Sequence, residues 1–210
     1  MGKKENALGA ALVEAGINLV QNPKGTGSTA RSDDLPVAAQ QEMTRLFESL
    51  GGTQSFRAPY ATGRWDFSDG HGLYLEFDEF EHFNRERLLT LSAPWSDQLP
   101  WAAAYRGYCV KHGHRARTYG KFWTSPSTEK QFGPAAPNGI VEGNGSPRWK
   151  QRAFYDALKD AQAVFRNDIQ LVRLSAYDRI SGQQLGDLLE KGLAVDPEEL
   201  RTLITQRSLG

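Results

Sequence analysis

The sequence predicts an α/β fold in which one central sheet is flanked by helices, and three observations lead to it. LYLEFDEF (73–80) alternates apolar and polar residues, as a strand with one apolar face does. Residues 36–50 and 147–165 are predicted to be helices, and IQLVRLSAYDRI (169–180) resembles a second buried strand. Because helical and strand patterns follow one another along the chain, the helices are expected on both sides of the sheet.

The first half of the chain is expected to hold two helices followed by short strands. Residues 5–20 read as a helix that stops at Asn22-Pro23, and the polar stretch 24–34 reads as a loop. Helical spacing returns over 36–50 and ends at Gly51-Gly52, with one apolar face made by Ala39, Met43, Leu46, Phe47 and Leu50. SFRAPY (55–60) and GRWDF (63–67) read as short strands, and the SDGHG turn leads into 73–80.

The second half is expected to be mostly helical. PWAAAYRGYCVKHG (100–113) reads as a helix, and the Gly/Pro/Ser/Thr-rich segment 118–145 reads as a long irregular loop. Ser146-Pro147 supplies a cap and a first-turn proline for the helix that runs to Phe165. After the strand at 169–180, two capped helices are expected, one at Ser181 with Gln184 and one at Asp196-Pro197 with Glu199.

These elements suggest three regions. They are an N-terminal helix and polar linker (1–35), an α/β core with the long loop at 118–145 (36–180), and a C-terminal helical extension (181–210). No apolar run approaches the roughly 20 residues that span a bilayer, so no membrane partner is expected. Cys109 is the single cysteine of the chain, which excludes an internal disulfide and favours a cytoplasmic protein.

Charge is balanced over the whole chain, with 25 basic and 25 acidic residues, but it is unevenly distributed. Residues 65–99 hold eight acidic and two basic side chains, a net charge of −6. Residues 101–152 hold nine basic and two acidic side chains, a net charge of +7. Such a pair of segments suits a metal site within a phosphate-binding surface, or two segments that simply neutralise each other.

The acidic strand itself suggests metal chemistry. Glu76 and Asp78 share one face of the strand, while Leu75 and Phe77 share the other. If 63–67 pairs with this strand through the SDGHG turn, Asp66 joins the acidic face, since opposite residues lie ~5 Å apart and diagonal ones ~7–8 Å. One hard cation could then bridge Asp66 and Glu76, because Mg²⁺ binds through one or two carboxylates and keeps other positions for water and phosphate oxygens.

Two further points bear on this acidic face. Glu42 lies at the edge of the apolar stripe of the 36–50 helix and could lean toward the sheet. Alternatively, Glu76 and Asp78 form the solvated face of an amphipathic strand, and their salt-bridge partners would be Arg64, Arg85 or Arg87. The residues alone leave both readings open.

FRAPYATGRWDF (56–67) and LYLEFDEFEHF (73–83) resemble the core of PD-(D/E)XK nucleases, closest to the branch around very-short-patch repair endonucleases. Members of that branch pair an Asp that ends a short strand with a Glu-x-Asp strand and a trailing His. The resemblance carries these roles to Asp66, to Glu76 with Asp78, and to His82, and Glu42 matches the acid of the helix that opens such cores. It implies a restriction-endonuclease-like mixed sheet, with extra helices at both ends of this chain.

The resemblance covers roughly 36–113 and 168–175, and this sequence departs from the family pattern at three positions. Trp65 stands where the family has Pro, Asp78 where better-known members have Lys, and Glu79 where the close branch has Gly. Without the motif Lys, the positive charge that polarises the phosphate is expected from His82, Arg85, Lys111 or a second metal ion.

The function expected from these patterns is that of an endonuclease dependent on Mg²⁺ or Mn²⁺, acting on nucleic acid and more on DNA than on RNA, in defence or repair. Asp66 and Glu76 would hold the metal, Asp78 and Glu42 would assist, and His82 would carry the proton unless it is a structural partner of Glu79 or of a backbone carbonyl. The nucleic-acid backbone would be neutralised by Arg85, Arg106, Lys111, Arg115, Arg117, Lys121, Arg148 and Lys150.

The alternative function is a non-catalytic nucleic-acid-binding or assembly module on a degenerate nuclease fold. A homodimer or a complex with a partner protein is compatible with either function. Trp149, between Arg148 and Lys150, could stack on a base, although packing into the core is the commoner role of a tryptophan. Core packing is also expected for Trp101, Tyr105, Tyr108, Phe122 and Trp123.

Overall fold

The acidic strand is at the centre of a five-stranded mixed sheet in the computed structural model, which describes residues 2–21, 29–114 and 123–209. The strand order is β1-β4-β5-β6-β9. The strands are β1 (Val20–Gln21), β4 (Phe67–Ser68), β5 (Leu73–Asp78), β6 (Gln170–Ser175) and β9 (Ser208–Leu209). β5 pairs antiparallel with β4 and parallel with β6, so the predicted mixed sheet with helices packed against it is confirmed.

Contacts divide the chain into two compact units, which we describe separately. The sheet unit comprises Met1–Thr29, Arg64–Phe80 and Arg166–Gly210, and the helical unit comprises Ala30–Gly63 and Glu81–Phe165. Each unit is thus assembled from separate stretches of the chain. No observation here tests the three sequence regions 1–35, 36–180 and 181–210, which stay a prediction.

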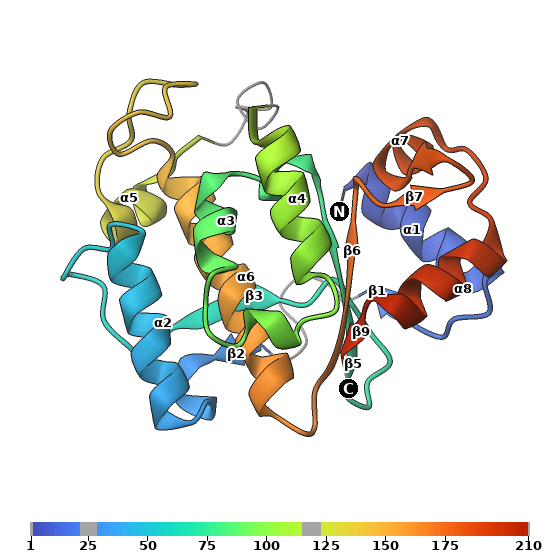
Figure 1. The fold of residues 1–210 in the computed structure, drawn as a ribbon, viewed down its shortest axis with the longest axis horizontal. Helices are drawn as coiled ribbons and strands as arrows, with labels where there is room; N and C mark the ends of the chain where they lie inside the picture. The colour runs from blue at the N-terminus through green and yellow to red at the C-terminus, as the bar shows by residue number, and fades with distance from the viewer. Residues whose placement is uncertain (1, 22–28, 115–122, 210) are drawn as a thin grey trace. The chain divides into compact units, whose positions relative to one another are not determined.

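In the sheet unit, helices pack on the sheet and on each other. They are α1 (Lys3–Glu14), α7 (Leu185–Lys191) and α8 (Pro197–Gln206), and a small hairpin is formed by β7 (Arg179–Ile180) and β8 (Gln183–Gln184). α1 contacts β1, α7 and α8, while α8 also contacts β6 (Figure 1). Both ends of the chain therefore contribute strands as well as helices to this unit.

In the helical unit, α6 is the longest element and three other helices pack against it. The elements are β2 (Thr29–Arg31), η1 (Ser32–Asp34), α2 (Val37–Ser49), β3 (Ala61–Arg64), η2 (Phe80–His82), α3 (Arg85–Thr90), η3 (Ser96–Gln98), α4 (Ala102–His112), α5 (Pro126–Phe132) and α6 (Pro147–Phe165). α2, α3 and α5 contact α6, and α4 contacts α3 (Figure 1). β2 and β3 form a separate two-stranded sheet.

An aromatic cluster fills the space between α2, α5 and α6. The ring centroid of Phe47 lies 5.1 Å from that of Phe132, 5.2 Å from that of Tyr60 and 5.3 Å from that of Phe154. Gly52 follows α2 against the same cluster, and a Cβ atom there would lie 2.2 Å from the Phe47 ring. Gly52 is thus required by close packing, while the neighbouring Gly51, with φ +81°, takes the left-handed conformation after the helix.

Several sequence expectations are wrong in detail. The first helix ends at Glu14 instead of continuing to 20, and residues 20–21 form the edge strand β1. SFRAPY (55–60) is not a strand, because Pro59 cannot donate to a ladder, and β3 follows it instead. The segment 118–145, expected to be an irregular loop, contains α5, which Ser125 caps by accepting from the backbone N–H of Thr128 at 3.3 Å.

The C-terminal expectations are confirmed in part. Asp196 caps α8 as predicted, accepting from the backbone N–H groups of Glu198 and Glu199 at 3.0 and 2.9 Å. The capping box expected at Ser181 with Gln184 is wrong, because α7 begins at Leu185 and Gln184 belongs to β8. None of the described helices combines the length and the apolarity that crossing a membrane requires.

Candidate active site

Asp66 and Glu76 lie next to each other in the sheet unit, as the hairpin register predicted. β4 pairs with β5 through Phe67 opposite Leu75, so the residue before Phe67 comes opposite Glu76. The backbone N–H of Asp66 donates to Oε1 of Glu76 at 3.1 Å, and the backbone N–H of Phe77 donates to Oδ2 of Asp66 at 2.9 Å. These reciprocal bonds fix the orientation of both carboxylates.

Glu76 and Asp78 are not a solvated face, so this alternative interpretation of the strand is wrong. Glu76 is 4% exposed and Asp78 is 1% exposed. Asp78 is paired with Arg173 of β6, whose Nη1 donates to both carboxylate oxygens at 2.8 Å. The sequence interpretation named three other arginines as salt-bridge partners and overlooked Arg173.

Arg173 is placed beside the acids by the parallel pairing of β5 and β6. The register puts Arg173 opposite Glu76 and Ser175 opposite Asp78. A fully buried arginine in an otherwise apolar strand is costly unless a carboxylate compensates it, and the pairing with Asp78 does so. Arg173 therefore neutralises Asp78, the acid that stands where the family motif has its Lys.

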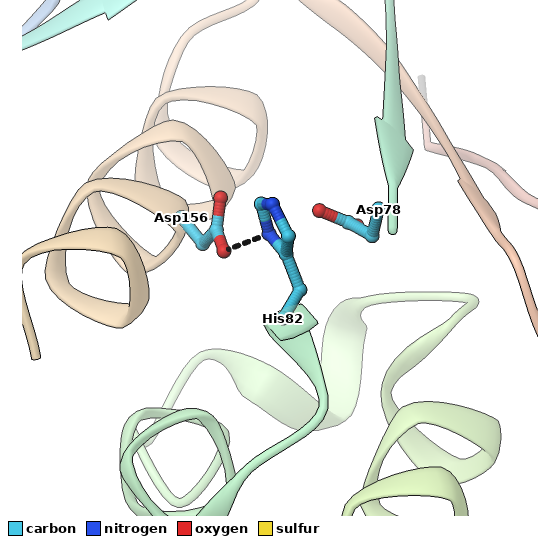
Figure 2. A group of neighbouring side chains, drawn as sticks. All are labelled: Asp78, His82 and Asp156. Atoms are coloured by element: carbon cyan, nitrogen blue, oxygen red, sulfur yellow. Dashed lines mark hydrogen bonds and ion pairs between the residues drawn. The ribbon is translucent and has the colours of Figure 1, made fainter. Parts of the chain in front are cut away.

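His82 of η2 is held by Asp156 of α6, with Nδ1 of the imidazole 2.9 Å from Oδ2 of Asp156 (Figure 2). The side chain of His82 is 18% exposed and that of Asp156 is 6% exposed. An ionised carboxylate only accepts, so in this contact Nδ1 of the imidazole is the donor. The expected alternative partner Glu79 instead accepts from Nζ of Lys4 at 3.2 Å.

Asp156 is a residue that the sequence analysis missed. It lies four residues before Asp160 on α6, and Asp160 accepts from Nη2 of the buried Arg87 at 2.7 Å. Residues at this spacing lie on one helix face, so α6 presents two acids to partners from η2 and α3. The available sequence signal was the position of these two acids, among the apolar residues on one face of the predicted 147–165 helix.

Glu42 is buried on α2 at 8% exposed, and its carboxylate forms an ion pair with Arg45 one turn later. It belongs to the helical unit, whereas Asp66, Glu76 and Asp78 belong to the sheet unit. The supporting role expected for Glu42 therefore stays a prediction.

The basic residues expected to contact nucleic acid differ widely in exposure. Lys111 is exposed on α4, and the Arg85 side chain is half exposed. Arg106 donates from Nη2 to the carbonyl oxygen of Leu91 and to Oδ1 of Asp97, both at 2.8 Å, so it ties the acidic segment to the basic one. Arg115, Arg117 and Lys121 lie outside the described residues.

Arg148 and Lys150, at the start of α6, are largely withdrawn from solvent. Burial lowers the pKa of the Arg148 guanidinium, and the like charge of Arg152 lowers it further. Burial also lowers the pKa of Lys150, whose Nζ donates to Oδ1 of Asn144 at 2.5 Å. The sequence assigned both residues to a nucleic-acid backbone, whereas the structure buries most of each side chain.

The tryptophans behave as core residues. Trp149 is 3% exposed and its ring meets that of Trp123 edge-on, with centroids 5.0 Å apart. Trp101 and Tyr105 are fully buried, Tyr108 is half-buried, and Phe122 lies outside the described residues. Base stacking by Trp149 is therefore excluded in this conformation.

Comparison with protein families places the residues of both units in one family. A model of the family DUF7255, described as a family of unknown function, matches residues 45–191. The chain belongs to DUF7255. The matched span of this DUF7255 protein includes Asp66, Glu76, Asp78, His82 and Asp156, and it excludes Glu42. No curated protein and no solved structure matches the chain.

Proposed function

We propose that this DUF7255 protein is a divalent-metal-dependent phosphodiesterase that cleaves nucleic acid, DNA more than RNA. The observation that carries the proposal is the reciprocal hydrogen bonding across the hairpin, in which the carboxylates of Asp66 and Glu76 each accept from a backbone N–H of the opposite side. Two adjacent carboxylates are the protein ligands that Mg²⁺ or Mn²⁺ takes when phosphate oxygens and water complete its coordination. When bound, the ion would lower the pKa of a water molecule and stabilise charge on the scissile phosphate.

The sheet topology supports a restriction-endonuclease-like fold in this proposal. Such a core needs a central strand with two acids, an antiparallel neighbour that brings a third, and a parallel neighbour on the other side. β5 carries Glu76 and Asp78, β4 follows Asp66, and β6 runs parallel to β5. Arg173, on β6, places a guanidinium beside these acids, where it is paired with Asp78.

On chemical grounds, His82 is the proton carrier of the proposal. Asp156 holds the imidazole in one orientation through Nδ1, as a general base that must face its substrate requires. The sequence interpretation gave this role to His82 without naming what orients it.

The experiment uses the full chain, a supercoiled DNA plasmid and Mn²⁺. Wild type is expected to nick the plasmid and to melt at a higher temperature with Mn²⁺ than without it. Asp66→Asn is expected to lose both effects, because the amide keeps the acceptor for the Phe77 N–H but removes the charge that binds the ion. Asp168→Asn, an exposed acid paired with Arg166, is the matched control and should behave as wild type.

Two outcomes would contradict the proposal. One is cleavage by Asp66→Asn at the wild-type rate, because this result would show that the catalytic metal is not bound by these two carboxylates. The other is a wild-type melting temperature that Mn²⁺ and Mg²⁺ leave unchanged.

A non-catalytic binding or assembly module is the second candidate, and one observation favours it. Asp78 occupies the position of the motif Lys, and its carboxylate is neutralised by Arg173 rather than presented to a ligand. A degenerate nuclease core of this kind would keep its fold without metal. This candidate is supported if the wild-type protein binds DNA but neither cleaves it nor melts at a higher temperature with Mn²⁺.

A further inference from the structure

A cavity of about 400 Å³ lies in the helical unit, where α2 ends beside α3 and the start of α6. Its lining combines three charged side chains with serine, leucine and glycine positions: Ser49, Leu50, Gly51, Arg85, Glu86, Leu89, Gly143 and Lys150. All of these residues belong to one unit, and none of them is a candidate metal ligand. We call it the Arg85–Glu86–Lys150 cavity.

Lys150 is built into this cavity rather than extended into solvent. It is 7% exposed, and its Nζ donates to Oδ1 of Asn144, whose amide nitrogen is itself anchored on the carbonyl oxygens of Phe132 and Pro134. Gly51, with φ +81°, permits this position, because a Cβ atom there would lie 3.1 Å from Nζ. An ammonium has three donors, so two remain for an anion beyond the bond to Asn144.

Arg85 brings a second cation to the same cavity. Its Nε donates to Oε1 of Glu86 at 2.8 Å, and its side chain is half exposed. Gly145, with φ +62°, lies against the guanidinium, since a Cβ atom there would meet Nη2 at 2.7 Å. The Nη groups of Arg85 and the ammonium of Lys150 thus provide donors of the kind that bind phosphate or carboxylate oxygens.

Glu86 makes the cavity selective. The residue is 4% exposed, and its Oε2 atom is buried with no hydrogen-bond partner among the described residues. A buried carboxylate oxygen needs a donor, and it repels any anion that has none to offer. A ligand of this cavity must therefore combine negative charge for the two cations with an N–H or O–H for Glu86.

We propose that the Arg85–Glu86–Lys150 cavity binds a phosphate group that carries a proton, either inorganic phosphate or the terminal group of a phosphate monoester. The monoanionic form has oxygens for Arg85 and Lys150 and one P–OH to donate to Oε2 of Glu86. Its single negative charge balances the net charge of +1 of these three side chains, which a neutral zwitterion does not. Sulfate and an internal phosphodiester carry no such proton near neutral pH, so the cavity distinguishes a phosphate end from a phosphate within a chain.

This inference is independent of the proposed nuclease activity. It uses different residues in the other unit, and its test contains no metal and measures no cleavage. If the chain does act on nucleic acid, the cavity would recognise a phosphorylated end.

The experiment is isothermal titration calorimetry of the full chain at pH 6.5 with four ligands. They are inorganic phosphate, sulfate, dimethyl phosphate as a phosphodiester without a proton, and glycine as a zwitterion. Inorganic phosphate is expected to bind with one site per chain, and the other three at least roughly tenfold more weakly, about 1.4 kcal/mol. Adenosine monophosphate and a 5′-phosphorylated oligonucleotide, compared with the same oligonucleotide ending in a 5′-hydroxyl, then identify the source of the phosphate.

Three variants test the assignment of the side chains. Glu86→Gln is expected to lose the preference for phosphate over sulfate, because the amide offers sulfate a donor in place of a repelling charge. Arg85→Ala is expected to weaken phosphate binding by at least roughly tenfold, because it removes one of the two cations of the cavity. Lys130→Met, on the exposed surface of α5, removes a lysine elsewhere and is expected to leave binding unchanged.

The proposal is overturned if phosphate fails to bind in the millimolar range, or if sulfate, dimethyl phosphate or glycine binds as tightly as phosphate. It is equally overturned if Arg85→Ala binds phosphate as wild type does. If Glu86→Gln folds poorly, two measurements still decide the outcome. They are the comparison of the four ligands on wild type and the phosphate affinity of Arg85→Ala.

Discussion

Breaking the ion pair between Asp78 and Arg173 is expected to lower the free energy of unfolding by about 3–5 kcal/mol. Both side chains are almost fully buried, 1% and 0% exposed, and Nη1 of Arg173 lies 2.8 Å from each oxygen of Asp78. Asp78→Asn keeps the shape and one acceptor but removes the charge, so the buried guanidinium loses the group that compensates it. For a chain of this length the loss corresponds to a fall in melting temperature of roughly 6–20 °C.

Urea unfolding followed by circular dichroism measures this loss in Asp78→Asn, in Arg173→Met and in the double variant. The two single losses are not expected to add, because the second substitution removes a group whose partner is already absent. Asp168→Asn breaks an exposed ion pair with Arg166 and is expected to cost no more than about 1 kcal/mol. The reasoning is refuted if Asp78→Asn loses less than about 1 kcal/mol, or if the single losses add.

Two further predictions concern the turn that joins β4 to β5. Gly72 has φ +115°, and a Cβ atom there would lie 2.6 Å from the carbonyl oxygen of Asp168, so Gly72→Ala is expected to cost about 1–3 kcal/mol in urea unfolding. Gly63→Ala, where a Cβ meets open space, should stay within about 0.5 kcal/mol of wild type, and equal losses at both positions would contradict the argument. The backbone N–H of His71 donates to Asp69 and lowers the pKa of its carboxyl group. Burial raises this pKa, and the backbone N–H of Leu73, which also donates to Asp69, lowers it further. Because the folded-state pKa lies below the unfolded one, this stabilisation is present above the unfolded pKa, near 3.9, and is lost as pH falls through the folded value. Asp69→Asn should therefore lose stability less steeply than wild type below about pH 4, and parallel acid limbs of the two unfolding curves would refute the assignment.

The parts of the fold that the sequence predicts well are those with a long local signal. The apolar period of 36–50, the Ser146-Pro147 start of 147–165 and the alternation of 73–78 each correspond to an observed element. The edge strands β1 and β9 have two residues each, too few for a period, and they exist because β4 and β6 offer free edges. α5 carried a readable signal, Ser125-Pro126, which the surrounding glycines and prolines obscured.

In the candidate site too, contacts between residues close in the sequence could be predicted, and contacts between residues far apart in the sequence could not. Asp66 and Glu76 are ten residues apart across one hairpin, so register arithmetic places them together. His82 and Asp156 are 74 residues apart, and no local pattern relates them. Arg173 could have been flagged, since a charge within the apolar run IQLVRLS must be paired if the strand is buried, but the sequence does not say with which acid.

Ion pairs neutralise part of the uneven charge, as one interpretation of the sequence expected. Arg106 of the basic segment pairs with Asp97 of the acidic one, while Asp78 and Glu79 of the acidic segment pair with Arg173 and Lys4. Charge counts therefore overstate how much basic surface is available to a polyanion. A charged side chain is a candidate binding group only where its geometry allows a donor or acceptor atom to contact a ligand.

The two proposed sites differ in the ligand that they would bind. Asp66 and Glu76 bring two negative charges together, which favours a cation, whereas Arg85, Glu86 and Lys150 carry a net positive charge with one buried acceptor, which favours a protonated anion. Because the first pair belongs to the sheet unit and the second set to the helical unit, a substitution in one is expected to leave the other intact. Asp66→Asn should thus retain phosphate binding, and Glu86→Gln should retain the response to Mn²⁺. Loss of both properties in either variant would show that the units do not act independently.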